Sequence, residues 1–438
     1  MIVQKLRLPI HYMSYSLRHE GLNSLETKEV NDIEETISAL LISIGILRAE
    51  KRQARRNYRK LVKNLCKFCG ILANIYTTKT VFYISNVIGP PRRRRTINSF
   101  SSKECWRRFR FRKRDLKRLL VVFGLDEVET TLGTDGKRGD FSGEEIVLYS
   151  LYRLASTTSH GECETLFNTD GSNLSAMYNW FISYMYYNFG HLVTNNIPYW
   201  SERFPVFSEA VRTKFTARTG LEIMVGNFKI VAFHDCTVIG CCRPGGGPSS
   251  AGQNAPRYNN FIQMAFYNGW KHMHGTKWLT VELPNGMCMD MHGPFSFRHN
   301  DLELFEDARL NDRLEAAQVD QENRYCSYGD SIFPNLTCCK SKHRANALTQ
   351  EEQLQNAGMG SMRIANEWHY GFTANLFPRV KHKSSLKIMQ SQNVSLMYLV
   401  CTLLRNARTC LYGSQTCRYF DCLPPTLENY FSQGAVNN

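Results

Sequence analysis

The spacing of apolar residues changes near residue 220, from a period typical of helices to one typical of strands. Before that point, apolar side chains recur every three or four positions in four segments, which predicts amphipathic helices. The first of them runs into a cationic stretch that is compatible either with a solvated face or with a surface that contacts phosphates or a protein partner. The predicted helical segments are residues 31–47, 144–155, 162–167 and 172–189.

The last three of these helices fall within a predicted helical domain over residues 116–200. A long helix, a short helix and a capped third helix make an order similar to a helix-turn-helix. The third helix is so rich in aromatic residues that much of it must lie in the core. Both DNA reading and a purely structural role fit this unit.

After residue 222, short apolar runs bounded by polar and turn residues predict strands. Pro-Asn-Gly at residues 284–286 predicts a hairpin turn between two of them. The order of strand, hairpin, helix, strand and helix predicts an α/β domain with a mixed sheet flanked by helices. The predicted strands are residues 229–237, 261–268, 277–283, 287–292 and a run that ends at Asp330, and the predicted helices are residues 300–315 and 361–372.

Three acidic residues stand at the ends of these elements. Asp235 follows a buried apolar run, Asp330 follows a second one, and Glu367 lies on the helix over residues 361–372. Burying an ionised carboxylate costs several kcal/mol unless it is paired or binds a metal. Oxygen ligands on separate elements suit Mg2+ or Mn2+, and two such ions can hold the attacking and leaving oxygens of a phosphodiester. Taken alone, any one of these acids fits a solvated or salt-bridged residue better than it fits a metal ligand.

The residues around the three acids resemble the PIF/Harbinger transposases and the DDE endonucleases derived from them. That family has Asp-Gly-Thr or Asp-Cys-Thr after its first core strand, Gly-Asp-Ser after a later one, and an Arg-x-x-x-Glu helix followed by Phe-Gly. This chain has Asp-Cys-Thr at 235–237, Gly-Asp-Ser at 329–331, Arg-x-x-x-Glu at 363–367 and Tyr-Gly at 370–371. The resemblance covers roughly residues 116–413, including the connecting segments 297–301 and 375–378.

The resemblance implies an RNase H-like core and cut-and-paste phosphoryl transfer. Asp235, Asp330 and Glu367 would be the catalytic residues and would hold two Mg2+ or Mn2+ ions. Related transposases work with a separate DNA-binding protein, so an accessory partner is a further expectation. Two positions depart from the family: Val238 stands where a histidine is usual, and Tyr370 replaces the usual phenylalanine.

The net charge of +15 points to an anionic partner, either nucleic acid or a membrane surface. No apolar run approaches the roughly 18 residues of a membrane span, and the first 18 residues lack the apolar stretch of a secretory signal. We therefore expect DNA rather than a membrane as the partner, and the nucleus as the location. A homo-oligomer is compatible with these features.

Basic segments supply the candidate DNA contacts. Two prolines precede four arginines at 92–95, which predicts an exposed arm that serves as a nuclear-entry signal, a phosphate contact or a plain linker. Residues 106–116 interleave arginines with aromatic rings, and residues 379–383 follow the Glu367 helix; an ordinary helix start and a solvated segment fit these two equally well. The candidate residues are Arg92, Arg93, Arg94, Arg95, Arg110, Arg112, Lys113, Arg379, Lys381 and Lys383.

The fifteen cysteines are scattered through apolar surroundings, so we expect reduced core thiols rather than a disulfide scaffold. Cys66 with Cys69, and Cys338 and Cys339 with His343, are incomplete zinc motifs. His234 should face away from Asp235 by strand alternation, and His369 lies about 200° around the helix from Glu367. Both histidines fit the core or a supporting position better than a ligand position.

The sequence thus predicts several regions and leaves three functions open. The first function is a metal-dependent DNA endonuclease or transposase. The second is a domesticated DNA-binding or partner-binding protein that keeps the fold without turnover, and the third is an RNA-processing nuclease. The predicted regions are a helical segment of uncertain role (1–88), a basic arm (89–115), the helix-turn-helix-like domain (116–200), the catalytic domain (221–413) and a C-terminal tail (414–438).

Overall fold

The computed structural model describes residues 94–133, 138–223, 226–244, 263–318, 323–344, 347–388 and 394–433. The chain divides into two compact units, one of residues 1–92 with 131–140 and one of residues 93–130 with 141–438. The predictions for residues 31–63 and for Cys66 and Cys69 lie outside the described residues. Two residues of the first unit, Thr131 on β1 (Glu129–Leu132) and Asp140 on β2 (Gly139–Ser142), are joined by a hydrogen bond in which Thr131 Oγ1 donates to Asp140 Oδ1 at 2.6 Å.

Local capping explains where the first helices begin. The Ser101 side chain accepts from the Glu104 amide at the start of α4, and Ser142 accepts from the Glu145 amide at the start of α6. Asp170 accepts from two amides at the start of α8. The three helices predicted over residues 144–189 are confirmed as α6, α7 and α8. The helices of this part are η1 (Ile97–Ser99), α4 (Ser102–Phe109), α5 (Lys113–Val122), α6 (Gly143–Ala155), α7 (His160–Phe167), α8 (Gly171–Phe189), α9 (His191–Thr194), α10 (Ile197–Ser201) and α11 (Phe204–Thr219).

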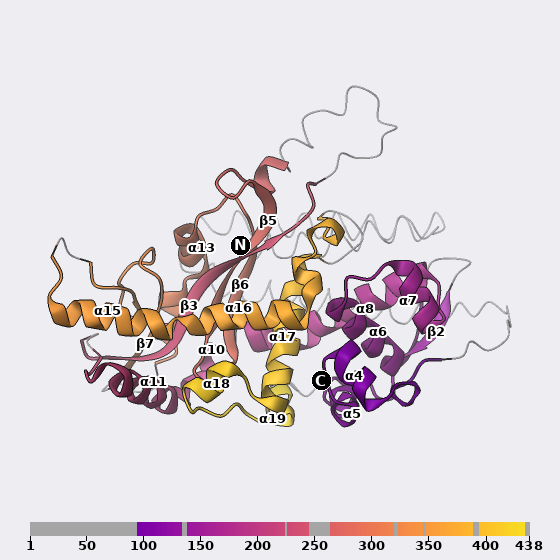
Figure 1. The fold of residues 1–438 in the computed structure, drawn as a ribbon, viewed down its shortest axis with the longest axis horizontal. Coiled ribbons are helices and arrows are strands. Elements are labelled where there is room, and N and C mark those ends of the chain that lie inside the picture. Colours follow the sequence, from indigo (N-terminus) through magenta and orange to yellow (C-terminus); the bar gives the residue numbers. More distant parts are fainter. Residues whose placement is uncertain are drawn as a thin grey trace, which may run out of the picture. The chain divides into compact units, whose positions relative to one another are not determined.

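The helices α6 and α8 form the centre of this helical part (Figure 1). Nearly every residue of α6 is buried, and α8 buries Tyr178 and Phe181 along with its aliphatic residues. The aromatic character of α8 is therefore that of a core helix, as its sequence predicts. Use of this unit to read DNA stays a prediction.

The sheet is mixed, as predicted, and its strands run in the order β4-β5-β3-β7-β8, with β6 also paired to β5. The long central strand β3 is antiparallel to β5 and parallel to β7, and β5 is antiparallel to β6. The strands are β3 (Phe228–Gly240), β4 (Tyr267–Asn268), β5 (Met273–Glu282), β6 (Cys288–Ser296), β7 (Arg324–Tyr328) and β8 (Cys339–Lys340).

The predicted hairpin between β5 and β6 is confirmed. Gly286 has a φ of 76°, and a side chain there would collide with Ser414 Oγ, so glycine is required on both counts. The strand predicted over residues 261–268 is mostly wrong. Within its described part, residues 263–268, a helical turn over 263–266 precedes β4, whose two residues pair with His274 and Met273 of β5.

Two predicted helices are each interrupted. The segment 300–315 divides at Arg309, whose φ of 49° ends α13. The segment 361–372 divides at Arg363, and Figure 1 shows α15 and α16 lying end to end there. The remaining helices are α13 (Asp301–Ala308), α14 (Leu310–Ala316), α15 (Gln350–Met362), α16 (Ile364–Leu376), η2 (Pro378–Lys381), η3 (Lys383–Ser385), α17 (Val394–Tyr412), α18 (Gln415–Tyr419) and α19 (Leu427–Phe431).

Both faces of the sheet are covered, and strand alternation sends Asp235 and His234 to opposite faces, as predicted. His234 is fully buried beside Phe305 and Phe333, with its Nδ1 2.9 Å from Ser327 Oγ. On the Asp235 face, α16 packs against β3 and β5. Among the described helices, none combines the length and the apolar character that a membrane crossing requires.

Candidate active site

Asp235 lies on β3, and Asp330 lies in the turn that follows the neighbouring parallel strand β7. Phe233 of β3 pairs with Tyr328 of β7, and Asp235 and Asp330 each follow two residues later. Adjacent strands lie about 4.8 Å apart, so these two positions are close to each other at this edge of the sheet. The negative charge of Asp330 contributes to raising the pKa of Asp235.

Asp235 is held by a cation from the junction between α15 and α16. Its Oδ2 accepts from Arg363 Nη1 at 2.6 Å and its Oδ1 accepts from the Cys236 amide at 2.9 Å. The side chains of Asp235 and Arg363 are each 20% exposed. Burial raises the pKa of Asp235 to about 6 although Arg363 and the amide oppose the shift, and Asp330 and Asp301 add to the rise.

Asp330 is fixed by the turn that carries it. Its Oδ1 accepts from the Ser331 amide at 2.5 Å, and the preceding Gly329 amide donates to the Lys340 carbonyl at 2.8 Å. A methyl group on Gly329 would lie 2.1 Å from Nε2 of His234. The glycine before Asp330 therefore lets the chain pass directly over the buried histidine.

Glu367 lies in the first turn of α16 and is exposed. Among the described residues, one other group has three potential metal ligands whose ligand atoms all lie within 4.8 Å of one another: Glu282, Cys288 and His369. The carboxylate oxygens of Asp235, Asp330 and Glu367 thus do not all lie within that distance of one another. Their joint role as metal ligands stays a prediction.

The donor set nevertheless fits a hard divalent cation. Asp235 offers carboxylate oxygens from β3 and Asp330 offers them from the turn after β7, and the helix that carries Glu367 packs against β3 and β5. Oxygen donors of this type are those that Mg2+ and Mn2+ prefer. The Arg363 guanidinium neutralises the negative charge of Asp235, which a bound metal cation would otherwise neutralise.

Two site residues were missed by reasoning from the sequence. Asp301, at the start of α13, contributes to raising the pKa of Asp235 and accepts from Lys277 Nζ at 2.7 Å. Arg363 was placed inside a helix rather than at a break facing Asp235. Both lie in segments that resemble the family, 297–301 and 363–367, and this resemblance is the sequence feature that could have indicated them.

The four-arginine arm is partly described, and its described members have partners. Arg94 is 2.6 Å from Glu129 and 3.8 Å from Glu145, and Arg95 donates to the Leu166 carbonyl at 2.9 Å. Arg92 and Arg93 lie outside the described residues.

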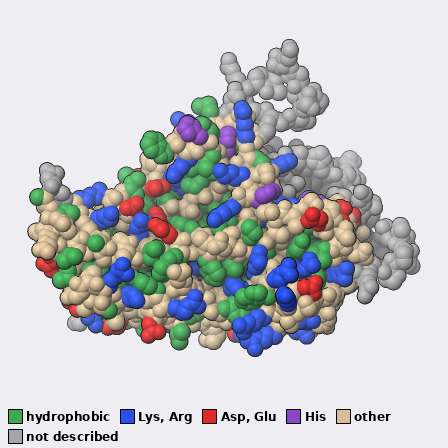
Figure 2. Space-filling view, viewed as in Figure 1, with side chains coloured by type: hydrophobic (Ala, Val, Ile, Leu, Met, Phe, Trp, Pro, Cys, Tyr) green, Lys and Arg blue, Asp and Glu red, His purple; other side chains and the backbone are tan. Residues whose placement is uncertain are grey.

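The basic residues of α4 and α5 gather on one surface, where Figure 2 shows Lys and Arg side chains clustered. Arg110 belongs to the scaffold more than to this surface, because it donates to the carbonyls of Leu376 at 3.0 Å and Ala155 at 3.0 Å. Arg112 is exposed, with its guanidinium 5.2 Å from the ring centre of Tyr412, and Lys113 donates to the Phe100 carbonyl at 2.8 Å. Arg112 and Lys113 remain predicted phosphate contacts.

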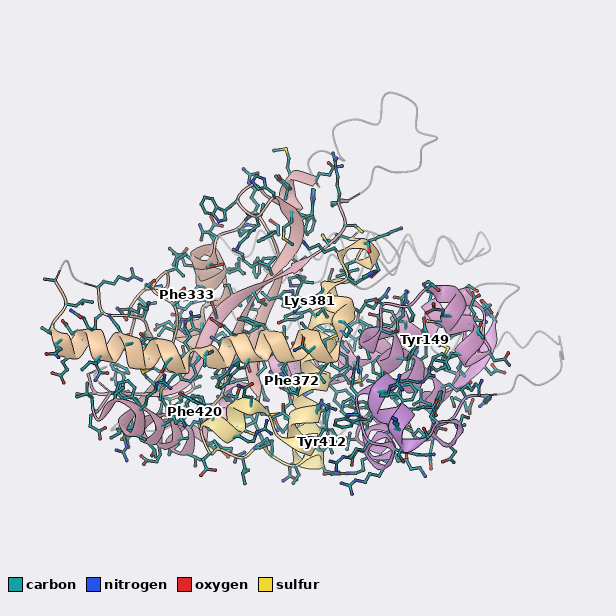
Figure 3. The ribbon with its side chains drawn as sticks, in the orientation of Figure 1. Tyr149, Phe333, Phe372, Lys381, Tyr412 and Phe420 are labelled. Carbon is teal, nitrogen blue, oxygen red and sulfur yellow. The ribbon has the colours of Figure 1, made fainter. Side chains whose placement is uncertain are left out.

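The basic residues after α16 divide into two kinds. Arg379 is 2% exposed, so a phosphate cannot reach it in this structure, and burial lowers its pKa. Lys381, labelled in Figure 3, and Lys383 are exposed. The predicted DNA contact therefore fits the two lysines and does not fit Arg379.

The cysteines of the described residues are free, and most are buried, as expected. Burial raises the pKa of Cys338 to about 11 and that of Cys339 to about 12, which disfavours the thiolates that zinc binds. His343 does not join them in a ligand group among the described residues.

Residues 234–406 match the model of a protein family described as DDE superfamily endonuclease. The matched segment is less than half of the chain and contains Asp235, Asp330 and Glu367. No curated protein and no solved structure matches the chain. The match supports a nuclease-type domain of the kind found in transposases, built on the mixed sheet.

Proposed function

We propose that this protein is a metal-dependent DNA endonuclease of the Harbinger transposase kind, which cuts phosphodiester bonds and joins the released ends to a target. The observation that carries the proposal is the position of Asp235 on β3 and of Asp330 just after the neighbouring parallel strand β7, inside the matched segment. The strand order β6-β5-β3-β7-β8, with β3 antiparallel to β5 and parallel to β7, supports an RNase H-like core.

Asp235, Asp330 and Glu367 would hold two Mg2+ or Mn2+ ions. When bound, such ions activate water and stabilise the charge that accumulates on the phosphate oxygens. Arg363 donates to Oδ2 of Asp235, and a metal ion bound to that oxygen would take the place of the guanidinium. The Ser331 amide keeps the Asp330 carboxylate aligned by donating to its Oδ1.

The DNA substrate is supported by the charge of +15 and by the exposed Lys381 and Lys383 just beyond the Glu367 helix. A nuclear location, an accessory DNA-binding protein and a homo-oligomer belong to the same proposal. The arginine arm at 92–95 and the family resemblance favour the first two.

Nicking of supercoiled plasmid in the presence of Mn2+ tests the proposal. The full chain should nick, and Asp330→Asn should abolish nicking while DNA binding, measured by fluorescence polarisation, is retained. Asp312→Asn is a matched control, because Asp312 is exposed and forms an ion pair with the neighbouring Arg309 at 2.9 Å. If the parent protein binds DNA and never nicks, it is a binding protein; if RNA competes better than DNA for cleavage, it is an RNA nuclease.

A further inference from the structure

Two consecutive residues of α16 contact β5 through polar groups, just after Glu367. His369 Nδ1 lies 3.0 Å from Glu282 Oε1, and the Tyr370 hydroxyl lies 2.9 Å from Thr280 Oγ1. Glu282 and Thr280 are two residues apart and so share one face of β5. The helix that carries the third acid is therefore tied to the sheet at two adjacent points.

The Tyr370 contact reaches the strand position beside the first acid. Thr280 is the cross-strand partner of Asp235, and Tyr370 lies one helical turn after Glu367. A hydrogen bond between Tyr370 and Thr280 thus connects the neighbourhood of Glu367 with that of Asp235. The resembling family usually has phenylalanine at this position, which cannot make this bond.

The His369 contact is part of a buried charge network. Arg405 Nη2 on α17 is 3.1 Å from Glu282 Oε2, and Arg405 Nη1 donates to the Gly286 carbonyl at 2.5 Å. Glu282, His369 and Arg405 are each at most 2% exposed. The network joins α16, α17 and the β5–β6 hairpin, and rotation of α16 would move His369 away from the buried Glu282 carboxylate.

A metal ion is a poor alternative at this network, although Glu282, Cys288 and His369 have ligand atoms within 4.8 Å of one another. The charges of Glu282 and Arg405 already cancel. A divalent cation with a Cys288 thiolate would leave one net positive charge in a fully buried site, which is costly. The burial of Cys288 also raises the pKa of its thiol well above the ordinary value.

We propose that Tyr370 and His369 are positioning residues, which fix the rotation of α16 on β5 so that Glu367 meets the edge of the sheet where Asp235 and Asp330 lie. This inference rests on the proposed function. A helix turns about 100° per residue, so slippage by one position would aim Glu367 away from that edge. Tyr370 contacts Thr280 beside the acids, and the adjacent His369 contacts Glu282 two residues further along β5.

Tyr370→Phe and Tyr430→Phe form a matched pair of variants. Tyr430, on α19, is fully buried and accepts from Asn406 Nδ2 at 2.8 Å, so this control also loses one buried hydroxyl contact. The dissociation constant for Mn2+ is measured by titration calorimetry, alongside the melting temperature and the nicking rate. Loss of a group that orients a metal ligand typically weakens metal affinity by about tenfold or more. We expect that weakening for Tyr370→Phe and a change below about twofold for Tyr430→Phe, with both variants melting at lower temperature than the parent.

Thr280→Val removes the other side of the same bond and keeps the shape of the side chain. It should weaken Mn2+ binding as much as Tyr370→Phe does, and the double variant should bind Mn2+ no more weakly than either single variant.

Equal Mn2+ affinities for Tyr370→Phe and Tyr430→Phe, in a parent protein that binds Mn2+ and nicks DNA, would overturn the positioning role and leave the proposed nuclease intact. A parent protein without Asp330-dependent Mn2+ binding would overturn both. Stoichiometric zinc in the purified protein, lost in Cys288→Ser, would assign the network to a metal instead.

Discussion

Replacing Arg405 by methionine should destabilise the fold far more than removing an ordinary surface charge. Arg405 and Glu282 are both 2% exposed and are 3.1 Å apart, so the variant leaves the Glu282 carboxylate buried without its cation. Removal of one partner of a buried pair costs about 3–5 kcal/mol. The double variant Arg405→Met with Glu282→Gln has no buried charge left there, so it should recover most of that loss.

The loss should also depend on pH in a defined direction. Burial opposes ionisation of Glu282, but Arg405 and His369 outweigh it and hold the pKa of Glu282 below its ordinary value. In the parent protein, the stabilisation from ionised Glu282 is therefore present above the unfolded-state pKa of about 4.3 and is lost as the pH falls through the folded-state pKa. Without Arg405, burial raises the pKa of Glu282, so protonation relieves the variant as the pH falls from 7. The difference between parent and variant should thus be largest near neutral pH and should shrink towards pH 4.

Urea unfolding followed by circular dichroism at several pH values measures this difference. Arg212→Met is the control, because Arg212 pairs with Glu209 at 2.7 Å on the exposed side of α11, and its midpoint should match that of the parent. An Arg405→Met variant as stable as this control, or one whose deficit is the same at pH 7 and pH 4.5, would refute the reasoning about the buried network.

Three further outcomes are expected. Lys381→Ala combined with Lys383→Ala should weaken DNA binding on all sequences and reduce the slope of log K against log salt by about 2, measured by fluorescence polarisation; an unchanged slope would exclude these phosphate contacts. Gly329→Ala should lower stability by about 1–3 kcal/mol in thermal unfolding, because the new methyl group overlaps His234 Nε2, and a neutral effect would contradict the close approach. Arg408→Ala should cost about 1 kcal/mol in urea unfolding through loss of the contact with the Trp106 ring, 4.2 Å away, and no cost would mean that this stacking is not stabilising.

The strands and the hairpin could be predicted because their signals are local. The apolar run before Asp235 and the Asn-Gly turn at 285–286 each specify an element within a few residues. The breaks at Arg309 and Arg363 could not be predicted in this way. Arg309 adopts a left-handed backbone, which its residue type does not require, and Arg363 faces a carboxylate 128 positions earlier in the chain.

Charge runs were the least informative signal at the candidate site. Arg110 and Arg379 have the same local character as Arg112 and Lys381, but their surroundings differ. Arg110 donates to carbonyls from distant helices and Arg379 is buried. Likewise, Glu282, His369 and Arg405 meet only in the folded chain, and nothing near any one of them in the sequence indicates the other two.

Anomalous diffraction from crystals grown with Mn2+ would locate the metal itself. We predict an anomalous peak between the carboxylates of Asp235 and Asp330, with Glu367 turned towards it and Arg363 released from Asp235. A peak at Glu282, Cys288 and His369, or no peak near Asp235 while its pair with Arg363 persists, would contradict the proposed nuclease.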